Sequence, residues 1–258
     1  MDEVISKDGT PIAYMKEGDG PPLVLVHGTG VIAKSWMRVL PGLSKNFSVY
    51  AIDRRGRGGS GDTEPYAIER EYEDIAAVVD SIDQPVNLMG HSSGGLYAFE
   101  GALLAKNVRR LLLYEPSITL PSVQKNFEEI IVSVEKLLND GQKEEALVTL
   151  YRIRGAPASD IERMQAQPEW EERVAIVDTV PRELRELERH TFDVEKFSAL
   201  QTPTRFLVGE KHLPLFNDLI QVLNETLPDC SSDMLPGQRH FAMDTAPDLF
   251  VNALTRFF

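Results

Sequence analysis

Short apolar runs rich in Val, Leu and Ile recur along the chain, and segments with apolar residues three or four positions apart lie between them. This alternation is typical of an α/β protein, in which helices cover both faces of a sheet. The Asp-Gly pair at positions 8–9 predicts an antiparallel hairpin between the first two runs. The later strands are expected to run parallel. Eight runs are predicted to be strands: Val4–Ser6, Ile12–Lys16, Leu23–His27, Val49–Asp53, Val86–Gly90, Arg109–Glu115, Thr204–Gly209 and Ser231–Leu235.

The alternation stops between residues 121 and 190, where we predict no strand. Helical spacing occurs there instead, at Val123–Leu138 and Glu144–Arg154. Charged residues occupy 25 of these 70 positions, against 42 of the other 188. We therefore predict a core domain made of residues 1–120 and 191–258, and a helical insertion at 121–190. Such an insertion is expected to lie over the carboxyl edge of the sheet, where open α/β sheets bind ligands.

Composition and charge restrict the class of protein and of ligand. The chain has 258 residues, of which 42% are hydrophobic and 26% charged, and this ordinary globular composition excludes a disordered or fibrous protein. Acidic side chains number 40 and basic ones 27, which gives a formal net charge of −13. That charge disfavours nucleic acid and anionic lipid, so a small, largely hydrophobic molecule is the expected partner.

Cysteine content and the length of apolar runs predict the compartment. The single cysteine, Cys230, has no partner for an internal disulfide, which fits a reducing environment. The acidic start, Met1-Asp2-Glu3, is unlike a signal peptide. Apolar runs such as Leu23–Val26 are far shorter than the roughly 18 residues that a membrane span needs. We expect a cytoplasmic protein with no membrane contact.

The segment Gly90-His91-Ser92-Ser93-Gly94 has the pattern G-x-S-x-G between a predicted strand and a predicted helix. In that context the pattern predicts a sharp turn with strained backbone angles at Ser92, whose hydroxyl is held out at the sheet edge. The start of the following helix offers free backbone N–H groups and a positive dipole. Ser92 is therefore the candidate nucleophile.

A serine hydroxyl needs a neighbouring base, and the chain has five histidines. His240 lies between the last predicted strand and the final helix, so its loop opens on the same edge as Ser92, and we predict that it is the base. His27 is expected to support the loop after its strand, and His91 to point away from Ser92. His190 lies in the helical insertion, far along the chain from the sheet edge.

Taken together, these motifs resemble the α/β-hydrolase superfamily over essentially the whole chain. The resemblance implies an eight-stranded, mostly parallel sheet with a helical cap after the sixth strand, where the segment 121–190 falls. It also implies an oxyanion hole made of the backbone amides of Thr29 and Ser93, which would stabilise negative charge on a substrate oxygen. The matching segments are His27–Gly30, Asp53–Ser60, the turn around Ser92 and Gly237–His240.

The acid of the expected triad departs from the common pattern. In members of the superfamily it usually follows the seventh strand, but here the loop 209–214 places His212 at that position. Glu115 ends the sixth predicted strand, 23 residues after Ser92, the spacing at which haloalkane dehalogenases and zearalenone-type lactone hydrolases carry their acid. We predict Glu115 as the acid. Glu210 is the alternative, and Glu115 could instead serve the structure or contact the substrate.

Gly56-Arg57-Gly58-Gly59-Ser60-Gly61 also satisfies the pattern G-x-G-x-x-G. A dinucleotide site needs a helix directly after the last glycine, whereas here the loop Asp62–Pro65 intervenes. We therefore expect no cofactor, and predict that this run forms a tight turn held by its arginines, with Asp53 in a structural role. No metal site is predicted.

These observations predict a cofactor-independent serine hydrolase that cleaves a carboxylic ester or lactone through an acyl-enzyme on Ser92. The same machinery serves a thioesterase, an amidase or a C–C bond hydrolase, and the scaffold could also act as a ligand-binding receptor. The sequence does not indicate an oligomeric state. The residues predicted to contact substrate are Gly28, Trp36, Trp170 and Phe216.

Overall fold

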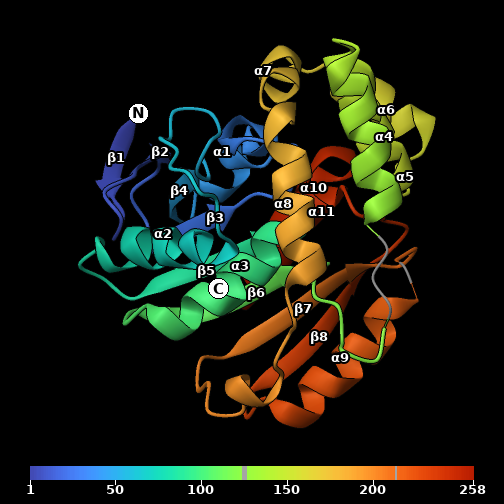
Figure 1. The fold of residues 1–258 in the computed structure, drawn as a ribbon. Coiled ribbons are helices and arrows are strands. Elements are labelled where there is room, and N and C mark those ends of the chain that lie inside the picture. The colour runs from blue at the N-terminus through green and yellow to red at the C-terminus, as the bar shows by residue number, and fades with distance from the viewer. Residues whose placement is uncertain (124–126, 213) are drawn as a thin grey trace.

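The computed structural model describes residues 1–123, 127–212 and 214–258, and its strands form one eight-stranded sheet (Figure 1). The strand order is β1-β2-β4-β3-β5-β6-β7-β8. The strands are β1 (Asp2–Ile5), β2 (Pro11–Glu17), β3 (Pro22–Val26), β4 (Ser48–Ile52), β5 (Val86–His91), β6 (Val108–Tyr114), β7 (Thr204–Gly209) and β8 (Cys230–Leu235).

Strand pairing agrees with the sequence-based expectation. β1 pairs antiparallel with β2, and β2 with β4, whereas all other neighbours are parallel. Every strand lies within two residues of its predicted bounds. The predicted eight-stranded, mostly parallel sheet and its N-terminal hairpin are thus confirmed.

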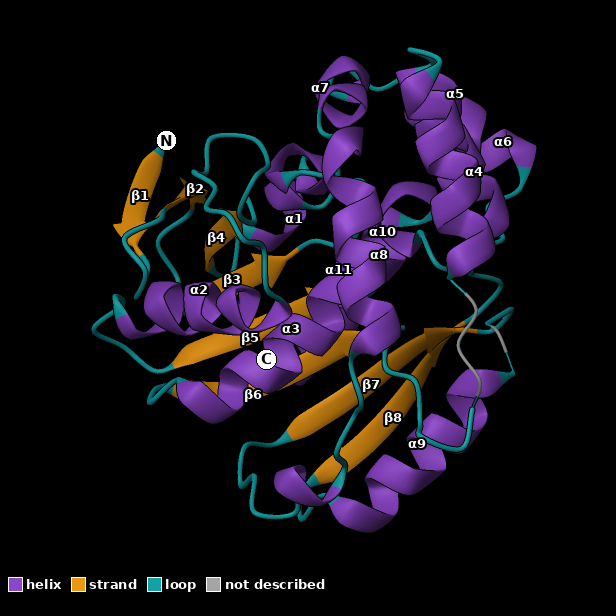
Figure 2. Ribbon diagram, in the orientation of Figure 1, coloured by secondary structure: helices purple, strands orange, loops and turns teal. Residues whose placement is uncertain are grey.

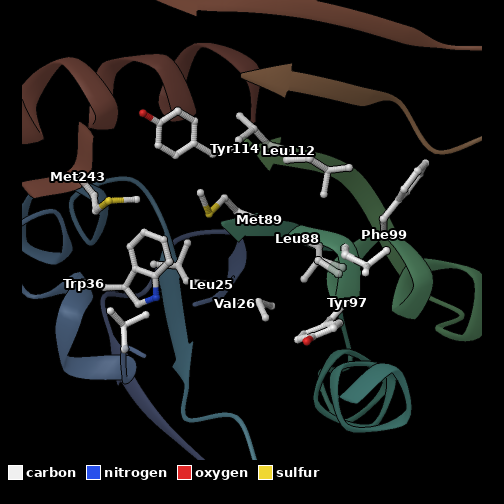
Figure 3. Close-up of a cluster of buried hydrophobic side chains, with 14 of the residues drawn as sticks. Leu25, Val26, Trp36, Leu88, Met89, Tyr97, Phe99, Leu112, Tyr114 and Met243 are labelled. Atoms are coloured by element: carbon white, nitrogen blue, oxygen red, sulfur yellow. The ribbon is translucent and has the colours of Figure 1, made fainter. Parts of the chain in front are cut away.

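The central strands are buried on both faces, which explains why they read as continuous apolar runs. Every residue of β3 and of β5 is buried. Successive side chains of a strand point to opposite faces. In Figure 3, Met89 accordingly points toward Trp36, whereas its neighbour Leu88 points toward Tyr97. Helices therefore cover both sides of this part of the sheet.

The order of the strands determines which face of the sheet each helix covers and where a ligand-binding crevice lies. The connection from β3 to β4 contains α1 (Leu40–Leu43), and the connection from β4 to β5 contains α2 (Ile68–Asp80). These two connections cross the sheet in opposite directions, because β4 and β5 lie on opposite sides of β3. Because such crossovers are right-handed, α1 and α2 lie on opposite faces. α2 packs on α3 (Ser93–Leu104), and α1 contacts α11 (Pro247–Phe257) (Figure 2). A reversal of strand order leaves a ligand-binding crevice at the strands' carboxyl ends, here those of β3 and β5.

Within the described residues, five α-helices lie between β6 and β7 in the sequence. α8 runs from this group toward α2, which it contacts (Figure 1). The expected helices at 123–138 and 144–154 correspond to α4 and α5, and residues 124–126 of the first lie outside the described residues. The five helices are α4 (Glu128–Asn139), α5 (Lys143–Ile153), α6 (Ala158–Gln165), α7 (Trp170–Ala175) and α8 (Val180–Arg189).

Two further helices complete the C-terminal part of the core: α9 (Leu215–Thr226) follows β7, and α10 (Ala242–Thr245) precedes α11. Short 3₁₀ turns span Ala33–Trp36, Val177–Thr179 and Glu195–Phe197. Throughout the described part of the chain, no helix has both the length and the apolar character that crossing a bilayer demands.

Candidate active site

Ser92 occupies a strained turn between β5 and α3. Its backbone angles, φ 57° and ψ −126°, are ones that residues with side chains rarely adopt. The Ser92 N–H donates to the Tyr114 carbonyl at 3.1 Å, and the Ser92 carbonyl accepts from the N–H groups of Gly95 and Ser117. These bonds to β6 and its loop hold the turn in place.

Two glycines allow the loop after β3 to approach this turn. A Cβ atom on Gly28 would lie only 2.8 Å from the Ser92 Cβ, and one on Gly94 would lie 2.3 Å from the His27 carbonyl oxygen. Both separations are far below normal contact distance. The absence of side chains at these positions lets the crevice between β3 and β5 close around the serine.

Glu115 and His240 are brought together from distant parts of the chain. Glu115 follows β6 directly and His240 precedes α10. The His240 Nδ1–H donates to Glu115 Oε2 at 2.8 Å, while Glu115 Oε1 accepts from the Gly209 N–H at 2.9 Å. Within residues 1–123, 127–212 and 214–258, Ser92 and Glu115 are the two non-glycine residues with left-handed φ. Backbone strain therefore coincides with two of the three predicted catalytic residues.

Ser92 and His240 line the same small cavity, of about 20 Å³. In the hydrogen bonds of the described residues, the Ser92 hydroxyl pairs with Ser117 Oγ at 3.3 Å, and none joins it to the imidazole of His240. The His91 ring lies 4.5 Å from the His240 ring, and its Nε2–H donates to the His240 carbonyl at 2.9 Å. Burial lowers the pKa of His91, so this ring is neutral and supports the His240 loop.

The two backbone amides expected to form an oxyanion hole are free donors. Over the part of the chain that is described, neither the Thr29 N–H nor the Ser93 N–H has an acceptor. The Thr29 hydroxyl donates to Ser93 Oγ at 3.0 Å, which links the two loops. Arg54 Nη1 donates to the same oxygen at 3.2 Å, so a cation contacts the side chains that link the two loops.

Arg54 belongs to a fully buried ion network that joins the core to α8. It pairs with Glu71 at 2.9 Å and Glu183 at 2.6 Å, and Arg57 pairs with Glu183 at 2.6 Å. Burial alone raises the pKa of Glu183, but the two guanidinium groups hold it below its ordinary value. The predicted turn held by arginines is therefore present, and it anchors α8, the last of the five helices between β6 and β7.

The glycine run does not form an open phosphate cradle. Asp53 accepts from the N–H groups of Ala33 and Gly59, and a Cβ on Gly58 would lie 2.1 Å from Asp53 Oδ2. The run thus folds tightly around its own carboxylate, as expected for a structural turn. Nowhere in the described ranges do three or more His, Cys, Asp or Glu side chains group so as to hold a metal ion.

The alternative acid is not in contact with the histidine. Glu210 Oε2 accepts from the Gly237 N–H at 2.6 Å instead. His212, which takes the usual place of the acid, contacts the Gly209 carbonyl and the Asn217 side chain. Residue 213 of this loop lies outside the described residues. Of the carboxylates considered from the sequence, Glu115 is the one that the fold places on the imidazole.

The predicted substrate contacts are partly wrong. Gly28 lines the small cavity with Ser92, and Phe216 lines a larger one beside His240. Trp36 instead lies in the core beside Met89 (Figure 3). It is 2% exposed and stacked on Phe250. Trp170 is also buried and donates its indole N–H to Glu144. Neither tryptophan lines the two cavities that reach Ser92 or His240, because Trp36 packs between β5 and α11 and Trp170 packs on α5.

Three residues at the site were not predicted from the sequence. Ser117 contacts the Ser92 hydroxyl, and Tyr151 of α5 donates its hydroxyl to the Gly30 carbonyl at 2.6 Å. Arg154, which caps the end of α5, lines both cavities. No local sequence pattern marks Tyr151 or Arg154, since their positions depend on how α5 docks. Ser117 lies two residues after Glu115, and this closeness in sequence to the predicted acid could have indicated that Ser117 belongs to the site.

Comparisons with known proteins agree with the fold described above. The family model described as "Alpha/beta hydrolase family" matches residues 23–253. The putative carbamate hydrolase RutD of Pseudomonas syringae pv. syringae (strain B728a) is 29% identical over 253 residues, covering 94% of this chain and 95% of that protein. The 2-hydroxy-6-oxo-6-(2'-aminophenyl)hexa-2,4-dienoic acid hydrolase of Metapseudomonas resinovorans is 23% identical over an alignment of 277 residues, covering all of this chain and 90% of that protein.

A solved structure extends the agreement to the whole fold. The crystal structure of an alpha/beta hydrolase from Sphaerobacter thermophilus DSM 20745 matches with a TM-score of 0.83 and 31% sequence identity, and the match covers 100% of both chains. Its sheet and connecting helices therefore follow the same path as those described above. The chain is a hydrolase that belongs to the alpha/beta hydrolase family.

Proposed function

We propose that the protein hydrolyses a carboxylic ester or lactone through an acyl-enzyme on Ser92. The observation that carries this proposal is the hydrogen bond of 2.8 Å between Glu115 Oε2 and His240 Nδ1, beside a serine held in a strained turn. A carboxylate on Nδ1 fixes the tautomer that leaves Nε2 free to accept a proton. Ser92, His240 and Glu115 would then act in the order nucleophile, base and orienting acid.

The proposed reaction has two halves. Nε2 of His240 takes the Ser92 proton as the oxygen attacks the ester carbonyl carbon, and the imidazolium then returns this proton to the leaving alcohol. Water adds to the acyl-enzyme by the same route and releases the acid. The Ser92 hydroxyl contacts Ser117 in the structure, so attack requires it to rotate toward the imidazole. Catalytic hydrogen bonds often tighten only when substrate is bound.

The free amides of Thr29 and Ser93 are suited to the negative oxygen of the tetrahedral intermediate. Loss of one such donor in a comparable site costs roughly 2.7–4 kcal/mol of activation free energy. Arg54, bonded to Ser93 Oγ, adds positive charge near these donors. Because the arginine is already paired with two buried glutamates, its position is fixed before the substrate arrives.

The helices between β6 and β7 would act as a cap over this site. Tyr151 of α5 donates to the Gly30 carbonyl, and a Cβ on Gly30 would lie 2.9 Å from Leu150 Cδ2. Leu150 and Tyr151 also line the small cavity that contains Ser92. α5 thus rests on the loop that carries Thr29, and this contact supports a role for the segment 121–190 in excluding water and selecting substrates.

Replacement of Ser92 tests the proposal. We expect Ser92→Ala to lower kcat for 4-nitrophenyl butyrate by at least about a thousandfold, because covalent catalysis is lost. A fluorophosphonate probe should label the wild-type protein at Ser92, as read by peptide mass spectrometry. Ser133→Ala, which removes a half-buried hydroxyl on α4 that bonds only to the Glu129 carbonyl of the same helix among the described residues, is the matched control and should leave both readouts unchanged. Full turnover in Ser92→Ala, or labelling elsewhere in the wild type, would refute the assignment.

A further inference from the structure

A cavity of about 280 Å³ lies against the candidate active site on the His240 side. Glu115, Ser117 and His240 form the wall that it shares with the site. Much of the remaining wall is apolar, as expected for a small-molecule pocket. The volume is close to the lower limit of about 300 Å³ for such pockets, so the cavity fits a compact molecule. The apolar lining includes Ile118, Leu120, Phe127, Phe216 and Leu219.

The charged lining of this cavity is basic, although the chain as a whole carries a net charge of −13. Arg154, Lys211 and Arg239 all line it. Among the lining residues that the structure describes, Glu115 is the one carboxylate, and it is already bonded to the Gly209 N–H and to His240. Among the described lining residues, the cations therefore outnumber the carboxylate.

Arg154 is the cation closest to the chemistry, since it lines this cavity and also the small one that contains Ser92. Its guanidinium lies over the Phe127 ring, 5.1 Å from the centroid. Burial lowers the pKa of this guanidinium. In the described part of the chain it has no ion-pair partner, whereas the buried Arg54, Arg57 and Arg173 each pair with a glutamate.

Arg154 is half-buried, so its guanidinium has lost part of its hydration, and an anion that joins it would stabilise it. Arg154 caps α5 three residues after Tyr151, whose hydroxyl is bonded to the Gly30 carbonyl, so this end of the helix is held beside the loop that carries Thr29. The planar fork of donors of Arg154 matches the two oxygens of a carboxylate. Lys211 and Arg239 are exposed, so they would attract the same anion toward the cavity.

We propose that the substrate carries a second, ionised carboxylate, and that Arg154 binds it while the ester carbonyl lies at Ser92. This inference rests on the proposed function, and it narrows the substrate class to compact monoanionic esters, such as half-esters of short dicarboxylic acids, or lactones that bear a carboxylate. Recognition of the carboxylate by Arg154 would make the charge, rather than hydrophobicity alone, the basis of substrate selection.

Two esters of the same shape test the proposal. The mono-4-nitrophenyl ester of glutaric acid has a terminal carboxylate, and the 4-nitrophenyl ester of glutaramic acid replaces it with a neutral amide. We expect wild-type kcat/KM to be at least tenfold higher for the acid than for the amide. Arg154→Gln should lower this ratio at least tenfold, mainly through KM for the acid, and Arg154→Lys should restore part of it.

Arg152→Gln is the matched control, because Arg152 is exposed two residues earlier and pairs with Glu145. It should leave the ratio unchanged. A ratio near one in the wild type, or one that Arg154→Gln does not lower, would overturn the proposal even if Ser92 is labelled by fluorophosphonate. Absence of that label would instead refute the proposed function.

A measurement on the wild-type protein covers the case in which the Arg154 variants do not fold. Glutarate should slow the labelling of Ser92 by fluorophosphonate, and glutaramide at the same concentration should do so at least tenfold less effectively. Equal protection by the two compounds, or protection by neither, would show that the cavity does not select a carboxylate.

Discussion

Replacement of Glu115 by glutamine is the sharpest test of how the site works. The carboxylate accepts two hydrogen bonds, one from the Gly209 N–H at 2.9 Å and one from His240 Nδ1–H at 2.8 Å. A glutamine of the same length keeps an oxygen for the Gly209 N–H, so the fold should be retained. Its NH₂ group then faces Nδ1, and the imidazole must place its proton on Nε2 instead.

The expected loss of activity follows from this change of tautomer. An imidazole protonated on Nε2 cannot accept the Ser92 proton, and the corresponding change in a serine hydrolase lowers kcat by roughly 10⁴. At about 1.36 kcal/mol for each factor of ten, this amounts to about 5.4 kcal/mol of transition-state stabilisation. We therefore expect Glu115→Gln to lower kcat by roughly three to four orders of magnitude, with little change in KM.

The assay is release of 4-nitrophenol under saturating substrate, with thermal unfolding measured on the same samples. Glu210→Gln is the matched control, since Glu210 contacts the Gly237 N–H and is absent from the hydrogen bonds of His240. It should change kcat less than about threefold. If Glu210→Gln were the more damaging substitution, or if folded Glu115→Gln kept near wild-type activity, the argument from the imidazole tautomer would be wrong.

Two further substitutions test the packing and the buried charges. Gly28→Ala should lower kcat at least tenfold, because the new Cβ would lie 2.8 Å from that of Ser92. Gly141→Ala is the control: with φ 73° and no atom within 4 Å of the new Cβ, it should lower stability without affecting kcat. Glu183→Gln should lower the free energy of unfolding at pH 7 by about 3–5 kcal/mol, because it leaves Arg54 without one of its buried partners. The pKa of Glu183 is lowered in the folded protein, so its contribution is complete above the unfolded pKa of about 4.5 and is lost as pH falls below it. Urea unfolding should therefore show the gap between wild type and Glu183→Gln narrowing from pH 5 to pH 3, and a gap independent of pH would contradict the assignment.

Local signals in the sequence were sufficient for the sheet and for the turn at Ser92. The central strands are apolar runs because they are buried on both faces, and this pattern needs no knowledge of tertiary contacts. The glycines around Ser92 are likewise required by the turn itself. Glu115 could be chosen because the carboxyl ends of parallel strands meet at one edge, which brings the end of β6 near the loop that carries His240.

Side-chain contacts beyond that edge could not be predicted. Trp36 and Trp170 were expected in a substrate pocket, but a large apolar side chain fits a pocket and a core equally well, and both proved to be buried. Arg154 and Tyr151 carry no local signal either. Their closeness to Ser92 depends on the angle at which α5 meets the Gly30 loop, and that angle is set by packing across more than 100 residues of sequence.

By itself, the sequence determined which segments form strands, which serine is strained and which carboxylate ends a neighbouring strand, because periodicity and turn chemistry act over a few residues. Only the tertiary structure decided that the arginine at the end of α5 lines a basic cavity beside that serine. The reason is physical: the free energy of a charge depends on what surrounds it, and those surroundings come from parts of the chain that meet only on folding.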